Sequence, residues 1–175
     1  DGTLIAAASS SQVEVWNRIT AERTSYFDLP RLKATSLDFS PNCRMLAVSG
    51  NDWTIKNFDT ACGCVKVMNL PIGASKTLMS STKEIRYIRF FTDDELIGLC
   101  AVPKQLKLWN MPNGDIRWQS AWTGARPRII ALSPDRKHLL AADRRTLQMI
   151  ECATGDVRYE VPCDFSLNAI EFIGD

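Results

Sequence analysis

Residues 133–155 read SPDRKHLLAADRRTLQMIECATG, and this stretch indicates the fold of the chain. It begins with a Ser-Pro-Asp turn, continues into an apolar segment and reaches an alternating run from Thr146 to Met149. Alternation of apolar and polar residues is typical of a β-strand with one buried face. The stretch ends on Gly155. A glycine here indicates a tight turn between strands, because glycine readily adopts the positive φ that such a turn requires.

The same order of features recurs four times along the chain. In each unit a large apolar residue precedes a small polar or acidic one, at Trp16-Asn17, Phe58-Asp59, Trp109-Asn110 and Ile150-Glu151. The intervals between these pairs are 42, 51 and 41 residues. A glycine-containing turn follows each pair except the first, which is followed by Ala21. Periods of about 40–45 residues, with four short strands each, are typical of propeller blades.

The repeat predicts an all-β fold: a β-propeller of four-stranded antiparallel blades, with about four blades in a single domain over residues 1–175. The blade units are expected at 1–33, 34–83, 84–127 and 128–167, with a further strand at 168–173. The residues between Leu70 and Glu84 are expected to form a loop insertion. No segment sustains a helical apolar period, so no helix is expected.

These units resemble the WD-repeat family over nearly the whole chain. The turn Ser133-Pro134-Asp135 and the two Trp-Asn pairs stand where that family carries its turn and its Trp-Asp dipeptide, whereas the family's usual Gly-His dipeptide is absent. Members commonly have seven blades, so the resemblance implies a fragment of a longer propeller whose remaining blades are partners. The alternative is a closed four-bladed ring, in which the strand at 168–173 completes the first unit.

Composition limits the classes of partner. Lysine plus arginine number 21 and aspartate plus glutamate 20, which leaves a net charge of +1 at pH 7. The chain therefore lacks the strong positive field that nucleic-acid binding requires. No apolar run approaches the roughly 18 residues that cross a bilayer. We expect neither nucleic acid nor a membrane as partner.

Residues suited to catalysis or metal binding are few. Of six cysteines only Cys62 and Cys64 are close together, and His138 is the single histidine, so no metal site is expected. Scattered cysteines suit a reducing compartment, the cytoplasm or the nucleus. Phosphate-loop, dinucleotide-binding and Gly-x-Ser-x-Gly motifs are absent. We expect no cofactor, no catalytic residue and no enzyme activity.

The resemblance also implies a binding face. In such propellers the loops joining second to third strands, and fourth strands to the next blade, open on one face that commonly binds partners. Tryptophan and arginine there are the residue types most enriched at interface hot spots. A partner with an acidic or phosphorylated segment would suit the arginines. The expected face carries Trp53, Lys104, Trp122, Arg126, Arg128, Arg144 and Arg145. The alternative is a solvated face, with Trp53 or Trp122 packed beneath a loop.

Three function classes follow. The first is a protein-binding scaffold, and the second is the recruiting or sensing segment of a multidomain enzyme or signalling ATPase. The third is a hydrolase or lyase along the central channel, where the innermost strands offer Asp38, Arg89 and Glu171. Three scattered charges carry little weight, and a fold alone licenses no activity, so the scaffold is preferred.

Overall fold

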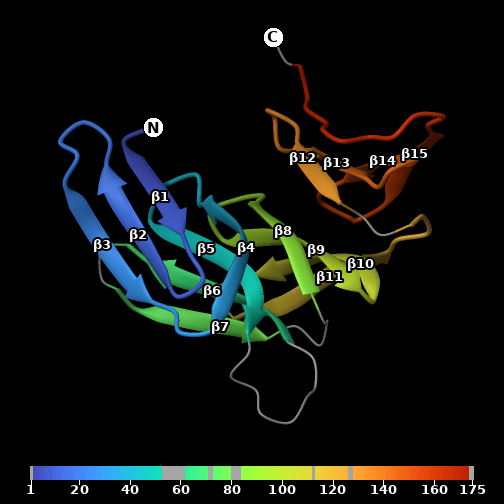
Figure 1. The fold of residues 1–175 in the computed structure, drawn as a ribbon. Helices are drawn as coiled ribbons and strands as arrows, with labels where there is room; N and C mark the ends of the chain where they lie inside the picture. The colour runs from blue at the N-terminus through green and yellow to red at the C-terminus, as the bar shows by residue number, and fades with distance from the viewer. Residues whose placement is uncertain are drawn as a thin grey trace.

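The computed structural model describes residues 2–52, 62–70, 73–79, 84–111, 113–125 and 128–173. These residues form fifteen β-strands and no helix, which confirms the all-β prediction, and none of them belongs to a helix long and apolar enough to cross a membrane. The strands form four antiparallel sheets, three with four strands and one with three. Figure 1 shows the sheets following one another in chain order, like successive blades.

Each sheet is built from consecutive strands. The first sheet contains β1 (Leu4–Ala8), β2 (Gln12–Asn17) and β3 (Arg23–Asp28). The second contains β4 (Leu32–Phe39), β5 (Met45–Asp52), β6 (Cys62–Asn69) and β7 (Ser75–Met79). The third contains β8 (Glu84–Phe90), β9 (Glu95–Val102), β10 (Lys104–Asn110) and β11 (Asp115–Ala121). The fourth contains β12 (Ile129–Leu132), β13 (His138–Ala142), β14 (Thr146–Glu151) and β15 (Val157–Pro162).

Apolar side chains between successive sheets hold the sheets together. In β9, Leu96 and Cys100 face the second sheet, whereas Ile97 and Leu99 face the fourth, and all four are 0% exposed. Successive residues of a strand point to opposite faces, so a sheet with two neighbours buries both of its faces. Each buried aliphatic side chain of this kind contributes roughly 1.5–3 kcal/mol to stability.

A β-bulge recurs beside the repeat position. In the first, third and fourth sheets the ladder between the last two strands shifts register just before the large apolar residue, at Val15/Trp16, Leu108/Trp109 and Met149/Ile150. A bulge places an extra residue in one strand and strengthens the local twist. The repeat in the sequence thus corresponds to a repeated backbone geometry.

The second sheet departs from the expected arrangement. Phe58-Asp59 lies outside the described residues, and the partner of β5 is β6, which ends in Met68-Asn69. Gly73 N donates to Asn69 O at 3.0 Å, as Gly114 N does to Asn110 O at 2.6 Å. With Met68 at the repeat position, the intervals become 52, 41 and 41 residues.

The loop insertion expected after Leu70 is therefore wrong. Residues 75–79 form β7 because their backbone pairs with β6, which completes the four-stranded sheet. The additional residues of this unit, 53–61, fall between β5 and β6 instead. The sheet also begins at Leu32, within the unit expected to end at residue 33.

The strand expected at 168–173 is not formed. Residues 163–173 belong to no strand, and among the described residues β1 pairs with β2 alone. A strand requires a hydrogen-bonded neighbour, and Figure 1 shows the C-terminal segment lying away from β1. The closed four-bladed ring is therefore not present in this structure.

Candidate partner-binding face

The face expected to bind partners lies at the end of the sheets where each innermost strand begins. Because the strands are antiparallel, the loops between second and third strands meet there with the connections between sheets. We call this surface the loop face; its described residues are 9–11, 29–31, 102–104, 122–125, 128, 143–145 and 163–168. Trp53 and Arg126 lie outside the described residues.

Arg144 and Arg145 are both exposed on the loop between β13 and β14. Leu167 N donates to Arg144 O at 2.9 Å, and Cys163 N donates to Arg145 O at 2.6 Å. Within the described part of the chain, no carboxylate forms an ion pair with either guanidinium. The two side chains therefore extend from a backbone held by hydrogen bonds, with their donors open to a ligand.

Trp122 lies beneath this face rather than on it. Its ring is 5% exposed, and its Nε1 donates to Asp143 Oδ2 at 3.4 Å. Asp143, 1% exposed, also accepts hydrogen bonds from Arg145 N at 2.7 Å and Thr146 N at 2.8 Å. Of the two expectations for Trp122, a position on the binding face is wrong and packing beneath a loop is found, because the carboxylate of Asp143 offers the indole N–H a buried partner.

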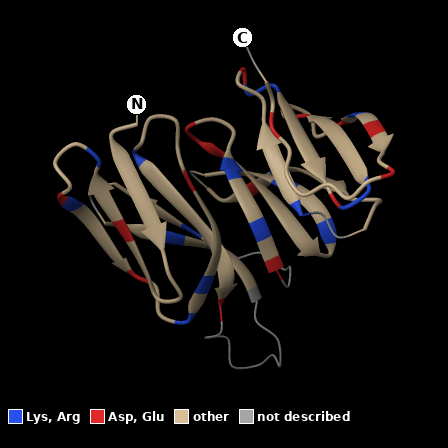
Figure 2. Ribbon diagram, turned by 45° about the horizontal axis from the view of Figure 1, so that its top comes forward, with Lys and Arg blue, Asp and Glu red and all other residues tan. Residues whose placement is uncertain are grey.

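Lys104 is exposed and is tied to the neighbouring loop. Its Nζ donates to Gly124 O at 2.7 Å, and its carbonyl accepts Trp122 N at 3.0 Å. A Cβ on Gly124 would lie 2.3 Å from Asp143 Oδ2, so only glycine fits between these two loops. Figure 2 shows lysine and arginine interspersed with aspartate and glutamate over all four sheets. Any attraction for an anion on the loop face is therefore local.

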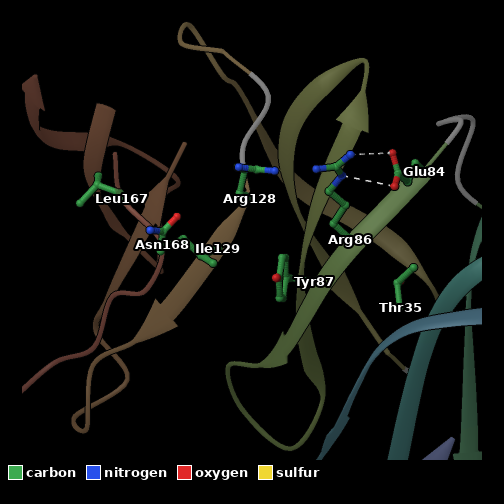
Figure 3. Close-up of a pocket in the computed structure, with 8 residues that line it drawn as sticks. All are labelled: Thr35, Glu84, Arg86, Tyr87, Arg128, Ile129, Leu167 and Asn168. Atoms are coloured by element: carbon green, nitrogen blue, oxygen red, sulfur yellow. Dashed lines mark hydrogen bonds and ion pairs between the residues drawn. The ribbon is translucent and has the colours of Figure 1, made fainter. Parts of the chain in front are cut away.

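A cavity of about 440 Å³ opens beside the loop face, between the innermost strands β4, β8 and β12. Figure 3 shows its lining residues, Thr35, Glu84, Arg86, Tyr87, Arg128, Ile129, Leu167 and Asn168. Arg128 is half-buried here, and its backbone N–H donates to Ala142 O at 2.8 Å. Of the predicted site residues, Arg128 is thus the one that the described structure places in this cavity.

The sequence did not point to Arg86 and Glu84. Arg86 Nη2 donates to Glu84 Oε2 at 3.3 Å, and its Nε lies 3.3 Å from Glu84 Oε1 without hydrogen-bond geometry. That Nε is buried and has no hydrogen-bond partner. The ladder of β8 with β9 skips Arg86, pairing Ile85 and Tyr87 on either side of it. A bulge changes which way a side chain points, and regular alternation in a sequence cannot reveal it.

Of the three charged residues considered for catalysis, Asp38 and Arg89 form hydrogen bonds within the fold. Asp38 Oδ2 accepts Phe90 N at 2.7 Å, which joins β4 to β8, and Arg89 donates to Ile88 O at 2.9 Å. Burial raises the pKa of Asp38, while the Phe90 N–H and the nearby Arg89 act in the opposite direction. Arg89 and Glu171 line a separate cavity of about 340 Å³.

The opposite end of the sheets carries the Ser-Pro-Asp turn and its variants. Ser133 Oγ donates to Asp135 Oδ1 at 2.6 Å and accepts His138 N at 2.9 Å. The hydrogen bond from Ser133 lowers the pKa of Asp135. Ser40 Oγ makes the same contact with Asn42 Oδ1 at 2.8 Å, so an amide oxygen replaces the carboxylate in the second sheet.

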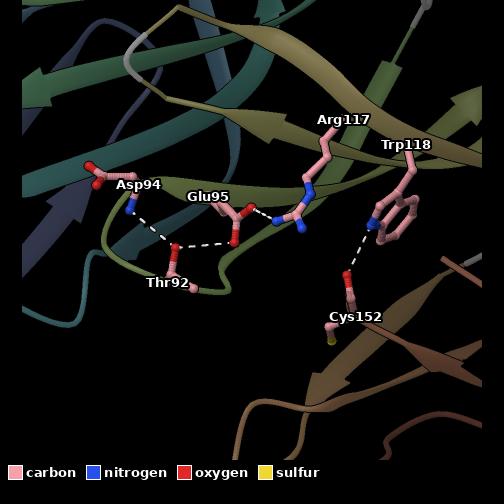
Figure 4. Close-up of polar contacts among 6 residues, drawn as sticks. All are labelled: Thr92, Asp94, Glu95, Arg117, Trp118 and Cys152. Carbon is pink, nitrogen blue, oxygen red and sulfur yellow. Dashed lines mark hydrogen bonds and ion pairs between the residues drawn. The ribbon is translucent and has the colours of Figure 1, made fainter. Parts of the chain in front are cut away.

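In the third sheet Phe91 takes the place of this serine, with its N–H donating to Glu95 O at 2.8 Å, and the hydroxyl comes from Thr92, one position later. Asp94 N donates to Thr92 Oγ1 at 3.3 Å, and Thr92 Oγ1 contacts Glu95 Oε2 at 3.4 Å (Figure 4). Arg117 forms an ion pair with Glu95, and Trp118 Nε1 donates across to Cys152 O in the fourth sheet at 2.9 Å. The acidic residues of this turn therefore serve local structure, and the tryptophan joins two sheets.

The described residues contain no group of three or more histidine, cysteine, aspartate or glutamate side chains that could hold a metal ion. Cys64 is 1% exposed and belongs to the core between the first and second sheets. The side chain of Cys62 lies outside the described part. His138 begins β13 and is half-buried.

Comparison with known proteins identifies one repeat by sequence. Residues 31–59 match the model of the WD40 family, described as WD domain, G-beta repeat. The match spans β4 and β5 and ends at Asp59, before β6 begins. A search of the curated proteins finds no match. The matched repeat and the four-stranded antiparallel sheets are consistent with a segment of a WD-repeat propeller.

Proposed function

We propose that this WD-repeat segment is a scaffold that binds another protein through its loop face. WD40 domains typically bind proteins, and the family consists mostly of non-enzymatic scaffolds. The observation that carries the proposal is the pair Arg144-Arg145, exposed and without an ion pair among the described residues. An exposed arginine pair can form bidentate hydrogen bonds with planar anionic groups.

The loop face is preorganised for such contact. The Asp143 carboxylate holds the Arg145 and Thr146 amides, and the buried indole of Trp122 packs below it. Lys104 links this region to the Gly124 carbonyl. Loops already held in place lose less conformational entropy when a partner binds, which favours affinity.

The expected partner is a protein with an acidic or phosphorylated segment. Its negative groups would meet guanidinium donors on a chain whose overall charge is only +1, so recognition depends on these positions rather than on a general field. The free thiols of Cys152 and Cys163 favour a reducing compartment, the cytoplasm or the nucleus.

Affinity capture from a cell extract with the full-length protein tests the proposal. The double variant Arg144→Glu, Arg145→Glu is compared with the matched control Arg44→Glu, Lys137→Glu, whose residues are exposed at the opposite end of the sheets. We expect wild type and control to capture a common partner and the loop-face variant to lose it by at least about tenfold. Equal capture by both variants, each with an unchanged unfolding midpoint, would show that the loop face is not the binding surface.

A further inference from the structure

The cavity beside the loop face is formed at two β-bulges. Thr35 in β4 and Arg86 in β8 are each skipped by the ladder to the adjacent strand of their own sheet, and both line the cavity. Bulges reorient single side chains while the flanking residues keep their pairing. Leu167, on the opposite wall, is bonded through its backbone to Arg144 of the loop face. The cavity and the loop face therefore form one continuous surface.

Positive charge in this cavity is only partly balanced. In Figure 3 the guanidinium groups of Arg86 and Arg128 point toward one another, and Glu84 lies on the far side of Arg86. Arg128 has no ion pair with a described residue. Arg86 Nε is buried without a hydrogen-bond partner, although one carboxylate is beside it. Two cations with one anion leave a charge of +1 among the side chains that line the cavity.

We propose that this cavity binds one carboxylate, the side chain of an aspartate or glutamate in an extended segment of the partner protein. The inference rests on the proposed scaffold function and names the group that is recognised. One carboxylate between Arg86 and Arg128 neutralises the local charge and supplies acceptors for both guanidinium groups. A phosphate, with a charge of roughly −1.5 to −2, would leave excess negative charge beside Glu84.

The walls suit the rest of such a side chain. Tyr87, Ile129 and Leu167 present apolar surface, and Asn168 adds an amide group. A volume of about 440 Å³ accommodates a side chain with its flanking backbone, which is much less than a folded domain. An extended peptide lying on the loop face could therefore place one acidic residue in the cavity.

Titration of the full-length protein with three short peptides tests the assignment. The probes are pentapeptides, acetylated at the N-terminus and amidated at the C-terminus, with four alanines and a central glutamate, glutamine or phosphoserine. Binding is measured from the changes in the protein's NMR chemical shifts, which detect weak complexes. We expect the glutamate peptide to bind about tenfold more tightly than the glutamine peptide, and Arg128→Gln to abolish the difference. The control is Arg89→Gln. Arg89 lies in β8, as Arg86 does, but it lines another cavity, so this variant should keep the preference for the glutamate peptide.

Glu84→Gln provides the sharper test, because it raises the local charge to +2. The phosphoserine peptide should then bind more tightly than the glutamate peptide, whereas in wild type the order is reversed. Tighter phosphoserine binding by wild type, or no preference between glutamate and glutamine, would overturn the carboxylate assignment. If extract capture still depends on Arg144 and Arg145 in that case, the scaffold function stands and only the cavity assignment fails.

Discussion

The first and third sheets carry a tryptophan at the same repeat position, but in different surroundings. Trp16 precedes Asn17 in β2, and Trp109 precedes Asn110 in β10, each just after a β-bulge. Trp109 is 3% exposed in the core between the second and third sheets, whereas Trp16 is only partly buried. Among the described residues, the third sheet has a neighbour on both faces, and the first sheet has one on a single face.

The two faces of the first sheet show the cause. Val13 and Val15 point toward the second sheet and are at most 1% exposed, whereas Ile5, which pairs with Trp16, is 48% exposed. A residue of the repeat is therefore core or surface according to whether a sheet stacks on it. The repeat therefore specifies which side chains are able to be buried. Whether each of them is buried depends on whether another sheet packs against that face.

Truncation of the two tryptophans should give the largest contrast. Trp109→Ala should lower the free energy of unfolding by about 3–5 kcal/mol, because it empties a buried site between two sheets. Trp16→Ala should lower it by only about 1 kcal/mol, because part of the ring already contacts water. Denaturant unfolding of the full-length protein measures both. Equal losses would show that the outer face of the first sheet is covered in solution.

A smaller contrast is expected at the residue beneath each tryptophan. A Cβ on Gly98 would lie 2.3 Å from Trp109 Cζ3, so Gly98→Ala should cost about 1–3 kcal/mol through overpacking. Ala7 occupies the matching register position in the first sheet and already carries a methyl group. Ala7→Gly should cost less than about 1 kcal/mol.

A double-mutant cycle checks the cause of the Gly98 effect. Combined with Trp109→Leu, Gly98→Ala should cost less than the sum of the two single changes, because leucine leaves room for the methyl group. Strict additivity would mean that the tryptophan ring is not what excludes a side chain at position 98.

The smallest contrast, with opposite signs, is expected in the turns after the two tryptophans. Ala21 has φ of 57° and Gly114 has φ of 80°, and each N–H donates to the residue four positions earlier. Ala21→Gly should raise the free energy of unfolding by about 0.5–1 kcal/mol, and Gly114→Ala should lower it by about 1–2 kcal/mol. Thermal unfolding midpoints compare the pair. A loss of stability in Ala21→Gly would refute the common turn geometry.

Much of the fold could be predicted from the sequence because its signals are local. Alternation around Leu106 and Leu108 marked one strand, β10, and the turn at Ser133-Pro134-Asp135 marked the start of another, β13. In the second unit Phe58-Asp59 and Met68-Asn69 are both plausible ends of a strand, and the family match over residues 31–59 includes the first pair. Among the described residues, β5 pairs with the segment that ends in Met68-Asn69, and pairing partners depend on the whole sheet.

The candidate site was predicted only in part. Arg144 and Arg145 were expected on a loop and are exposed there, because a short connection between two strands lies at the protein surface. Trp122 was misplaced because its partner, Asp143, lies 21 positions away in the chain. Arg86 was missed because a bulge, invisible in the sequence pattern, moved it out of the strand's regular alternation.

By itself the sequence determined the period of the repeat, the all-β class and the exposed arginine loop. Each depends on residues within a few positions of one another, through alternation, turn propensity and solvation. Only the tertiary structure decided that Trp109 is core and Trp16 is not, that residues 168–173 form no strand, and that Arg86 and Arg128 line one cavity. Burial, strand pairing and charge convergence are properties of segments distant in the chain, so they arise only when the sheets assemble.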